Sequence, residues 1–175
     1  MLLALLVKLE SNGPVLFLQT RVGRNNKDFK LFKFRSMYLD AEKRGQLTVG
    51  MRDSRITRVG YFLRKYKLDE LPQLLNVWLG DMSLVGPRPE VRKYVDLYTP
   101  EQQRVLTVRP GITDYASIRF INENELLAQA EHPEEFYIKE IMPQKLTLNL
   151  IYINNPSIFK DLLLILNTAR KIFFN

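Results

Sequence analysis

The stretch that decides how this chain is interpreted is KLDELPQ at residues 67–73, followed by GDMSLVGPRP at residues 80–89. Two adjacent carboxylates, Asp69 and Glu70, lie among basic residues, and the loop that follows holds Arg88 between two prolines. Neighbouring side chains on a helix diverge by about 100°, so we expect two separate roles for these carboxylates rather than one shared proton. An acidic pair with cations indicates a site for a divalent metal ion and phosphate.

The size and residue usage of the chain exclude several kinds of chemistry. Its 175 residues predict one domain over residues 1–175. Because cysteine is absent, disulfides, thiolate catalysis and cysteine-ligated zinc are excluded. The single histidine, His132, lies in an acidic stretch, where we expect a surface residue near a helix start. Serine–histidine catalysis is therefore not expected.

The positive charge of the chain points to an anionic partner without naming it. The net charge is +7, and basic residues outnumber acidic ones mainly in the first half. A cationic surface can bind nucleic acid, anionic lipid or a polyphosphate ligand. Charge alone does not choose among these three.

The local patterns predict an α+β fold that is mainly helical with a short β-hairpin or small sheet. Residues 15–19 and 29–34 are aromatic and β-branched runs around an Asn-containing turn, which indicates two strands. We expect helices over residues 58–67 and 70–78, and short helices near 99–102 and 122–125. A longer helix over 134–153 should bend at Pro143, and a last helix should run from about 155 to 174.

Both ends of the chain have apolar character. Residues 1–9 are apolar for seven positions and then charged, which is too short to span a bilayer and lacks the features of a signal peptide. They indicate the end of a buried or interfacial helix. The last helix has one broad apolar side, which suits either packing on the core or a position in the membrane interface.

Six blocks of this chain together resemble the bacterial sugar transferases called monotopic phosphoglycosyl transferases. The blocks occur in order at residues 11–15, 19–23, 32–37, 55–60, 68–73 and 80–89. The resemblance runs from about residue 5 to residue 110 and continues more loosely to the C-terminus. Such enzymes move a sugar phosphate from a nucleotide sugar onto a membrane polyprenol phosphate.

The resemblance implies roles for the acidic pair and for the proline-flanked arginine. Asp69 would be the nucleophile that forms a phosphosugar–aspartyl intermediate, and Glu70 would ligate Mg²⁺, a hard cation that prefers oxygen ligands. Arg88 would contact the nucleotide, with Pro87 and Pro89 restricting the backbone on either side. The alternative for the acidic pair is a helix start that complements the helix dipole.

Three further cations are candidates for phosphate binding. Lys33 and Arg35 are two residues apart on an expected strand, so their side chains should share a face. Arg64 precedes Asp69 by five residues and is expected to orient it or to meet the phosphate. A surface salt bridge is the alternative for each of the three.

The resemblance also implies partners and a location. The donor would be a nucleotide sugar, with UDP as the expected nucleotide, and the acceptor would be polyprenyl phosphate in contact with membrane lipid. No nucleic acid is expected as a partner, and a homodimer is left open. Residues 1–10 resemble the returning half of a re-entrant membrane helix, so the chain would be monotopic on the cytoplasmic face and would lack the first part of its anchor.

Two observations bear on substrate and on the alternatives. The run Pro-Gly-Ile-Thr at residues 110–113 fits the family, but the continuation from Asp114 departs from the usual Gly-Trp-Ala-Gln, which leaves the sugar open. A nucleic-acid-binding module and an inactive membrane-surface partner of glycan assembly remain as other readings. The former lacks zinc spacing and an RNA-recognition signature, and the latter would not require the intact acidic pair.

Overall fold

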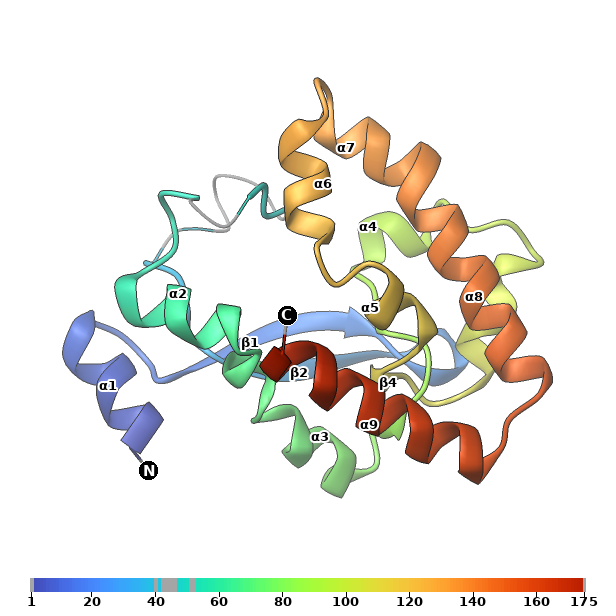
Figure 1. The fold of residues 1–175 in the computed structure, drawn as a ribbon, viewed down its shortest axis with the longest axis horizontal. Helices are drawn as coiled ribbons and strands as arrows, with labels where there is room; N and C mark the ends of the chain where they lie inside the picture. The colour runs from blue at the N-terminus through green and yellow to red at the C-terminus, as the bar shows by residue number, and fades with distance from the viewer. Residues whose placement is uncertain (1, 40, 42–46, 51–52, 175) are drawn as a thin grey trace.

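The computed structural model describes residues 2–39, 41, 47–50 and 53–174 (Figure 1). Helices predominate, and the strands among these residues form two sheets of two strands each. The predicted α+β class is therefore confirmed.

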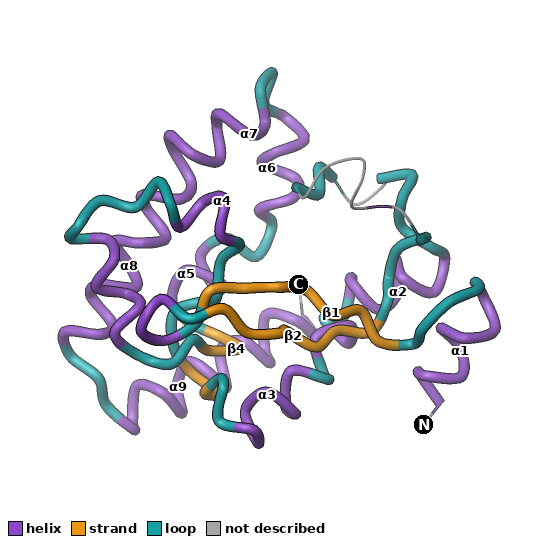
Figure 2. The backbone as a smooth tube through the Cα atoms, turned by 180° about the vertical axis from the view of Figure 1, so that it is seen from behind, coloured by secondary structure: helices purple, strands orange, loops and turns teal. Residues whose placement is uncertain are grey.

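A β-hairpin crosses the middle of the molecule (Figures 1 and 2). Strand β1 (Leu16–Val22) pairs antiparallel with β2 (Asp28–Phe34), and Leu16 lies opposite Phe34. The turn includes a short 3₁₀ helix, η1 (Arg24–Asn26), in which Asn25 has φ 57°. Asparagine tolerates this left-handed conformation better than most residues. The predicted hairpin is confirmed and is longer than its apolar runs suggested.

Two helices lie beside one end of the hairpin (Figure 1). Helix α1 (Leu2–Glu10) packs against α2 (Arg58–Lys65). The side chain of Thr57 caps α2 by accepting a hydrogen bond from the Gly60 amide. The Glu10 carboxylate accepts another from the Val59 amide, at 3.0 Å, so the end of α1 is tied to the start of α2.

The segment that follows α2 is helical throughout but changes type. A 3₁₀ turn, η3 (Leu68–Glu70), leads through two residues in the right-handed helical conformation into α3 (Gln73–Leu79). The expected helix over residues 70–78 is thus present with an earlier, tighter first turn. Lys67 precedes it with φ 54°, which turns the chain sharply between α2 and η3.

A second sheet, which the sequence did not predict, brings distant segments together. Strand β3 (Ser83–Val85) runs parallel to β4 (Gly111–Thr113). A Cβ atom on Gly111 would lie 2.1 Å from the Gly86 nitrogen, so the close approach of the two chains requires glycine there. As a result, residues 86–89 lie next to residues 111–114.

The second half of the chain is a set of helices around the main core. In chain order these are α4 (Arg92–Val95), η4 (Gln102–Thr107), α5 (Tyr115–Arg119), α6 (Glu123–Gln129), α7 (Pro133–Phe136), the π-helix η5 (Tyr137–Ile141), α8 (Met142–Asn154) and α9 (Ile158–Phe174). The predicted interruption near Pro143 is confirmed as the change from π to α geometry one residue before it. Tyr94, Leu127, Tyr137 and Leu146 are among the residues of the core that these helices enclose.

Helix α9 packs on the core along one part of its surface and exposes apolar side chains along another, and its sequence was compatible with both positions. It packs through Leu164, which joins Val85 and Tyr152 in a smaller buried cluster. Six other large apolar side chains of the helix are exposed: Ile158, Phe159, Leu162, Leu163, Ile165 and Leu166. None of the helices described is both long enough and apolar enough to cross a membrane.

Candidate active site

Most of the candidate site residues predicted from the sequence line one cavity of 1180 Å³. One part of its wall comes from the hairpin and the α2–α3 region, and another from α5, α6, α8 and α9. The predicted site residues in its lining are Lys33, Arg35, Arg64, Asp69, Glu70 and Arg88. Residues that are far apart in sequence therefore meet in one place.

The helical segment from η3 through α3 has its polar face inside and its apolar face outside. Buried positions recur at the helical spacing i, i+3, i+4 and i+7, and they are Asp69, Pro72, Gln73 and Asn76. The exposed positions are Leu71, Leu74, Leu75, Trp78 and Leu79. In a water-soluble surface helix the distribution is the reverse, so this segment is built to present apolar surface outward.

Asn76 fixes the inner face of this segment to the hairpin. Its Nδ2 donates to the Lys30 carbonyl at 2.7 Å, and its Oδ1 accepts from the Phe32 amide at 3.0 Å. Both groups of this fully buried amide are therefore satisfied. These bonds hold α3 against β2, and η3 with the acidic pair also contacts β2.

Asp69 is a buried carboxyl group with an unused oxygen. Its residue is 5 % exposed, and its Oδ1 has no hydrogen-bond partner among the described residues. Burial, followed by the charge of the adjacent Glu70, raises the pKa of Asp69, while Lys33, Arg64 and Lys67 act in the opposite direction. The negative charge of Asp69 is therefore costly in this position, which favours a reaction that neutralises it.

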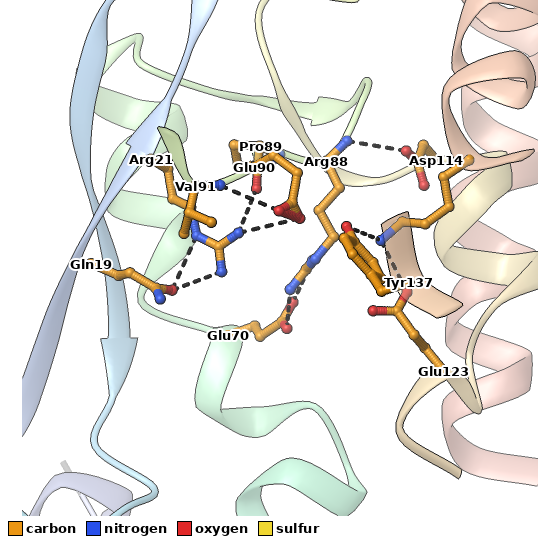
Figure 3. A network of polar contacts seen from close by, with 11 residues as sticks. Gln19, Arg21, Glu70, Arg88, Pro89, Glu90, Val91, Asp114, Glu123 and Tyr137 are labelled. Carbon is orange, nitrogen blue, oxygen red and sulfur yellow. Dashed lines mark hydrogen bonds and ion pairs between the residues drawn. The ribbon is translucent and has the colours of Figure 1, made fainter. Parts of the chain in front are cut away.

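Glu70 forms a forked ion pair with Arg88 (Figure 3). Arg88 Nη1 donates to Glu70 Oε2 at 2.9 Å, and Nη2 donates to Oε1. Burial alone would raise the pKa of Glu70, but the charges of Arg88, Lys33 and Lys67 together hold that pKa well below its usual range. Glu70 is thus ionised, whereas burial disfavours the ionised form of Asp69 beside it. This difference in environment is consistent with separate roles for the two carboxylates.

The loop that carries Arg88 is held by contacts on every side. The Arg88 amide donates to Asp114 Oδ2 at 3.1 Å, and Asp114 also caps α5 through the Ser117 amide. The carbonyl of Pro87 accepts from the Gly111 amide at 3.0 Å, and that of Pro89 accepts from Arg21 Nη1 at 3.0 Å. The two prolines therefore fix the loop through their carbonyls as well as their rings.

Lys33 extends from β2 into the same electrostatic cluster. Burial lowers the pKa of Lys33 to about 8, with Arg88 and Arg21 acting in the same direction and Glu70 and Asp69 opposing them. Arg64 also lines the cavity, and its charge lowers the pKa of Asp69. Both cations therefore lie close enough to the acidic pair to meet a phosphate bound there.

Arg35 has partners of a different kind. Its guanidinium donates to the carbonyls of Ser11 at 2.7 Å and Val7 at 3.2 Å, and also to that of Asn12. These carbonyls belong to the end of α1 and the connection after it. The sequence left open which of Lys33 and Arg35 reaches phosphate. In the structure the Arg35 guanidinium joins α1 and the connection after it to the end of β2.

A second polar network lies along the cavity wall (Figure 3). Arg21 bonds Gln19 and pairs with Glu90, while Lys145 pairs with Glu123 at 2.9 Å and lies over the Tyr137 ring. Burial, and then the charge of Glu90, raise the pKa of Tyr137 far above its ordinary value. Arg21 thus joins the hairpin to the loop that carries Arg88, and Lys145 joins α8 to α6.

Sequence reasoning missed several residues of the site. Lys67 lines the cavity and acts on both carboxylates, and its place two residues before Asp69 could have revealed it. Asp114 was visible only as a departure from the family pattern. Nothing in the local sequence marked Lys145, because its role depends on packing between helices that are distant along the chain.

The acidic pair offers the oxygen donors that Mg²⁺ prefers. No group of three or more His, Cys, Asp or Glu that could hold a metal ion occurs among the described residues. Mg²⁺ nevertheless commonly uses one or two carboxylates together with substrate phosphates. The lone pairs that Glu70 retains beside its bonds to Arg88 fit that pattern.

Comparison with known proteins identifies relatives over nearly the whole chain. A family model described as bacterial sugar transferase matches residues 1–175. The chain is 42% identical over 175 residues to a UDP-N-acetylgalactosamine-undecaprenyl-phosphate N-acetylgalactosaminephosphotransferase of Aeromonas hydrophila, covering 97% of this chain and 38% of that protein. It is 39% identical over 172 residues to a UDP-glucose:undecaprenyl-phosphate glucose-1-phosphate transferase of Caulobacter vibrioides, covering 97% and 60%. It is also 39% identical over 166 residues to the uncharacterized sugar transferase EpsL of Bacillus subtilis, covering 95% and 73%.

Proposed function

Because the chain belongs to the bacterial sugar transferase family, we propose that it transfers a sugar 1-phosphate from a UDP-sugar to undecaprenyl phosphate. The names of the Aeromonas and Caulobacter relatives supply both substrate classes. The observation that carries the proposal is the buried Asp69 carboxyl beside the Glu70–Arg88 pair in one large cavity. The product would start the assembly of a surface polysaccharide or glycoconjugate.

The reaction divides into two displacements at one phosphorus atom. Asp69 Oδ2 attacks the phosphorus that carries the sugar, an O–P bond forms, and the phosphoanhydride bond breaks so that UMP leaves with the electron pair. An oxygen of polyprenyl phosphate then attacks the same phosphorus. The bond to Asp69 breaks, and the carboxylate is regenerated. The raised pKa of Asp69 supports this role, since forming the O–P bond removes the negative charge of a carboxylate that burial makes costly.

The cations around Asp69 suit the phosphates of the donor. Catalysis of phosphoryl transfer consists largely of positioning and of neutralising charge on the phosphate oxygens. Lys33, Arg64 and Lys67 line the cavity near the acidic pair, and we assign them to these oxygens. Arg88, held by Glu70 and by the backbone around it, would orient the nucleotide portion.

Mg²⁺ is the expected cofactor, with Glu70 as its protein ligand. When bound, it would supply further neutralisation of phosphate charge. Glu70 is suited to this role because its carboxylate stays ionised and because Arg88 fixes its orientation.

The exposed apolar surface supports membrane association. The outer face of α3 and the exposed side of α9 present large apolar residues, and α1 adds Leu2, Leu5, Leu6 and Leu9. Leu71 and Leu74 belong both to this surface and to the cavity lining, so a lipid acceptor could reach the acidic pair from the membrane. We assign the protein to the cytoplasmic face of the membrane because the proposed nucleotide donor is a soluble compound.

The test is release of UMP from a panel of UDP-sugars by the protein in lipid vesicles, with Mg²⁺ and with or without undecaprenyl phosphate. We expect release that depends on one sugar and is abolished by Asp69→Asn. The matched control, Asp81→Asn, changes an exposed aspartate and should retain activity. UMP release that survives Asp69→Asn would refute the covalent mechanism.

A further inference from the structure

Gln73 is a buried amide whose polar atoms are unused. The residue is 1 % exposed, and neither its Oε1 nor its Nε2 has a hydrogen-bond partner among the described residues. Buried side-chain amides are nearly always hydrogen-bonded, so each exception requires an explanation. A leucine would fill similar space at this position without this cost.

Gln73 lies on the same buried stripe as Asp69. The residues between them keep right-handed helical geometry, with φ and ψ of −53° and −37° at Leu71 and −62° and −14° at Pro72. Side chains four residues apart on a helix are neighbours, with Cβ atoms about 5–6 Å apart. Asp69 Oδ1 is likewise buried without a hydrogen-bond partner among the described residues, so an unused acceptor and an unused donor belong to side chains one helical turn apart.

Anchoring of the helix does not account for Gln73. Asn76, one turn later on the same stripe, already binds the hairpin through both of its polar groups. The other charged groups that act on Asp69 are Glu70, Lys33, Arg64 and Lys67. Among the described residues none of these groups donates a hydrogen bond to Oδ1, so this oxygen is open to the amide.

We propose that Gln73 is a positioning residue for Asp69, whose Nε2 donates a hydrogen bond to Asp69 Oδ1 and so directs Oδ2 at phosphorus. When Oδ2 forms its bond to phosphorus, Oδ1 becomes the carbonyl oxygen of the acyl phosphate and still accepts from Nε2. A neutral donor is suited to both states because it adds no charge. The assignment to phosphorus chemistry rests on the proposed function, whereas the contact itself does not.

The first arm of the test compares turnover with stability. Gln73→Leu loses one hydrogen bond to a buried carboxylate but also removes the cost of burying an amide, so its melting temperature should change by only about a few degrees. Its kcat should fall by about 10–100-fold with little change in KM for the donor, as expected for a lost interaction at the reacting group. Gln73→Glu, which keeps the shape but removes the donor, should also lose turnover. A fall in melting temperature with unchanged kcat would show a structural role and overturn the proposal.

The second arm measures the contact without any catalysis. Melting temperatures of the wild type, Gln73→Leu, Asp69→Ala and the double variant form a cycle at neutral pH. We expect a departure from additivity of about 2–4 °C, whereas additive effects would overturn the contact. If the wild type releases no UMP but the cycle is non-additive, the proposed function fails and the Gln73–Asp69 contact stands.

Discussion

At the scale of single residues, the two neighbouring carboxylates of the site have different surroundings. Glu70 is matched by the Arg88 guanidinium and stays charged, while Asp69 lacks such a partner and is buried. This difference supports the two roles that we propose for the same chemical group, one electrostatic and one nucleophilic. The difference arises from Arg88, which lies 18 residues after Glu70 in the chain.

Replacing Arg88 by lysine tests whether the forked geometry matters as well as the charge. Lysine keeps the positive charge but cannot donate two parallel hydrogen bonds to Glu70, so we expect kcat/KM for the donor to fall by about 10–100-fold. The matched control is Arg92→Lys, which alters an exposed pair with Asp28 and should leave kcat/KM nearly unchanged. Equal kinetics of the two variants would assign Arg88 a charge role alone.

Lys33 predicts a basic limit to activity. Burial lowers its pKa to about 8, and only the protonated amine can neutralise phosphate, so kcat/KM should decline as the pH rises through about 8. Lys33→Arg should move this decline to higher pH. Conformational stability should change in the other direction: the folded pKa lies below the unfolded value of 10.5, so the free energy of unfolding should rise between these two values. A pH–rate profile and urea unfolding across pH 7–11 would check both signs.

At the scale of elements, the segment from η3 through α3 combines a catalytic face with a surface face. Its inner stripe carries Asp69, Gln73 and Asn76, and its outer side carries Trp78, which is 83 % exposed. One short helix can therefore present the nucleophile to the cavity and apolar side chains to a lipid surface. This arrangement explains why a buried stripe is polar in a helix whose exposed side is apolar.

Substitutions on the outer face of α3 should weaken membrane binding without unfolding the protein. We expect Leu75→Ser combined with Trp78→Ser to reduce the fraction that floats with liposomes, because apolar area inserted into lipid contributes to binding. The melting temperature in detergent should change little, since both side chains are exposed. Leu97→Ser, an exposed leucine after α4, is the control. Flotation equal to that of the control would exclude α3 from the membrane contact.

Arg35 acts between elements and should affect stability more directly than chemistry. Arg35→Met removes hydrogen bonds to the carbonyls of Val7, Ser11 and Asn12, and we expect a loss of about 2–4 kcal/mol in the free energy of unfolding. Arg58→Met, at an exposed position of α2, should cost far less. Denaturant titration of both variants measures the difference. A stable Arg35→Met variant that fails to bind UDP would instead support the phosphate role expected from the sequence.

At the scale of the whole molecule, the cavity joins the hairpin and the helices of the second half of the chain. Its lining includes Lys33 and Asp69 on one side and Glu123, Lys145 and Lys171 on the other. The parallel pairing of β3 with β4 connects the two sides. A ligand bound between them would contact both and would stabilise the fold as a unit.

Binding of UDP with Mg²⁺ should therefore raise the melting temperature of the whole domain. At a ligand concentration of 100 times Kd the gain is about 2.7 kcal/mol, which corresponds to roughly 5–11 °C for a domain of this size. Omission of Mg²⁺ or the variant Glu70→Gln should reduce the shift, as measured by thermal denaturation. A full shift under both conditions would remove Glu70 as the metal ligand.

Much of the local structure could be predicted because it depends on neighbouring residues. The apolar runs around Asn25 and Asn26 predicted the hairpin, and Pro143 predicted the interruption in the long helix. The Thr99–Gln102 capping pair was also visible, and both of its hydrogen bonds are present. It starts the 3₁₀ helix η4 rather than a longer helix.

Other features could not be predicted because they join segments that no sequence period relates. Strands β3 and β4 are three residues each, too short for a detectable pattern, and they pair only because Gly86 and Gly111 allow close approach. Arg35 followed the expected position next to β2, yet its partners lie on α1. The sequence shows which side chains are charged, but it does not show which groups each of them contacts.

The sequence by itself determined the family, the mainly helical α+β class and the identity of the acidic pair, because these depend on residue types and their local spacing. Only the tertiary structure decided that Arg88 pairs with Glu70 and that Asp69 is buried with one oxygen lacking a partner among the described residues. It also decided that Asp114 holds the Arg88 loop. The buried amide of Gln73, which has no hydrogen-bond partner among the described residues, is a third feature of this kind. The physical reason is that burial and pairing are properties of the packed chain. A carboxylate's environment is set by whichever distant segments the fold brings against it.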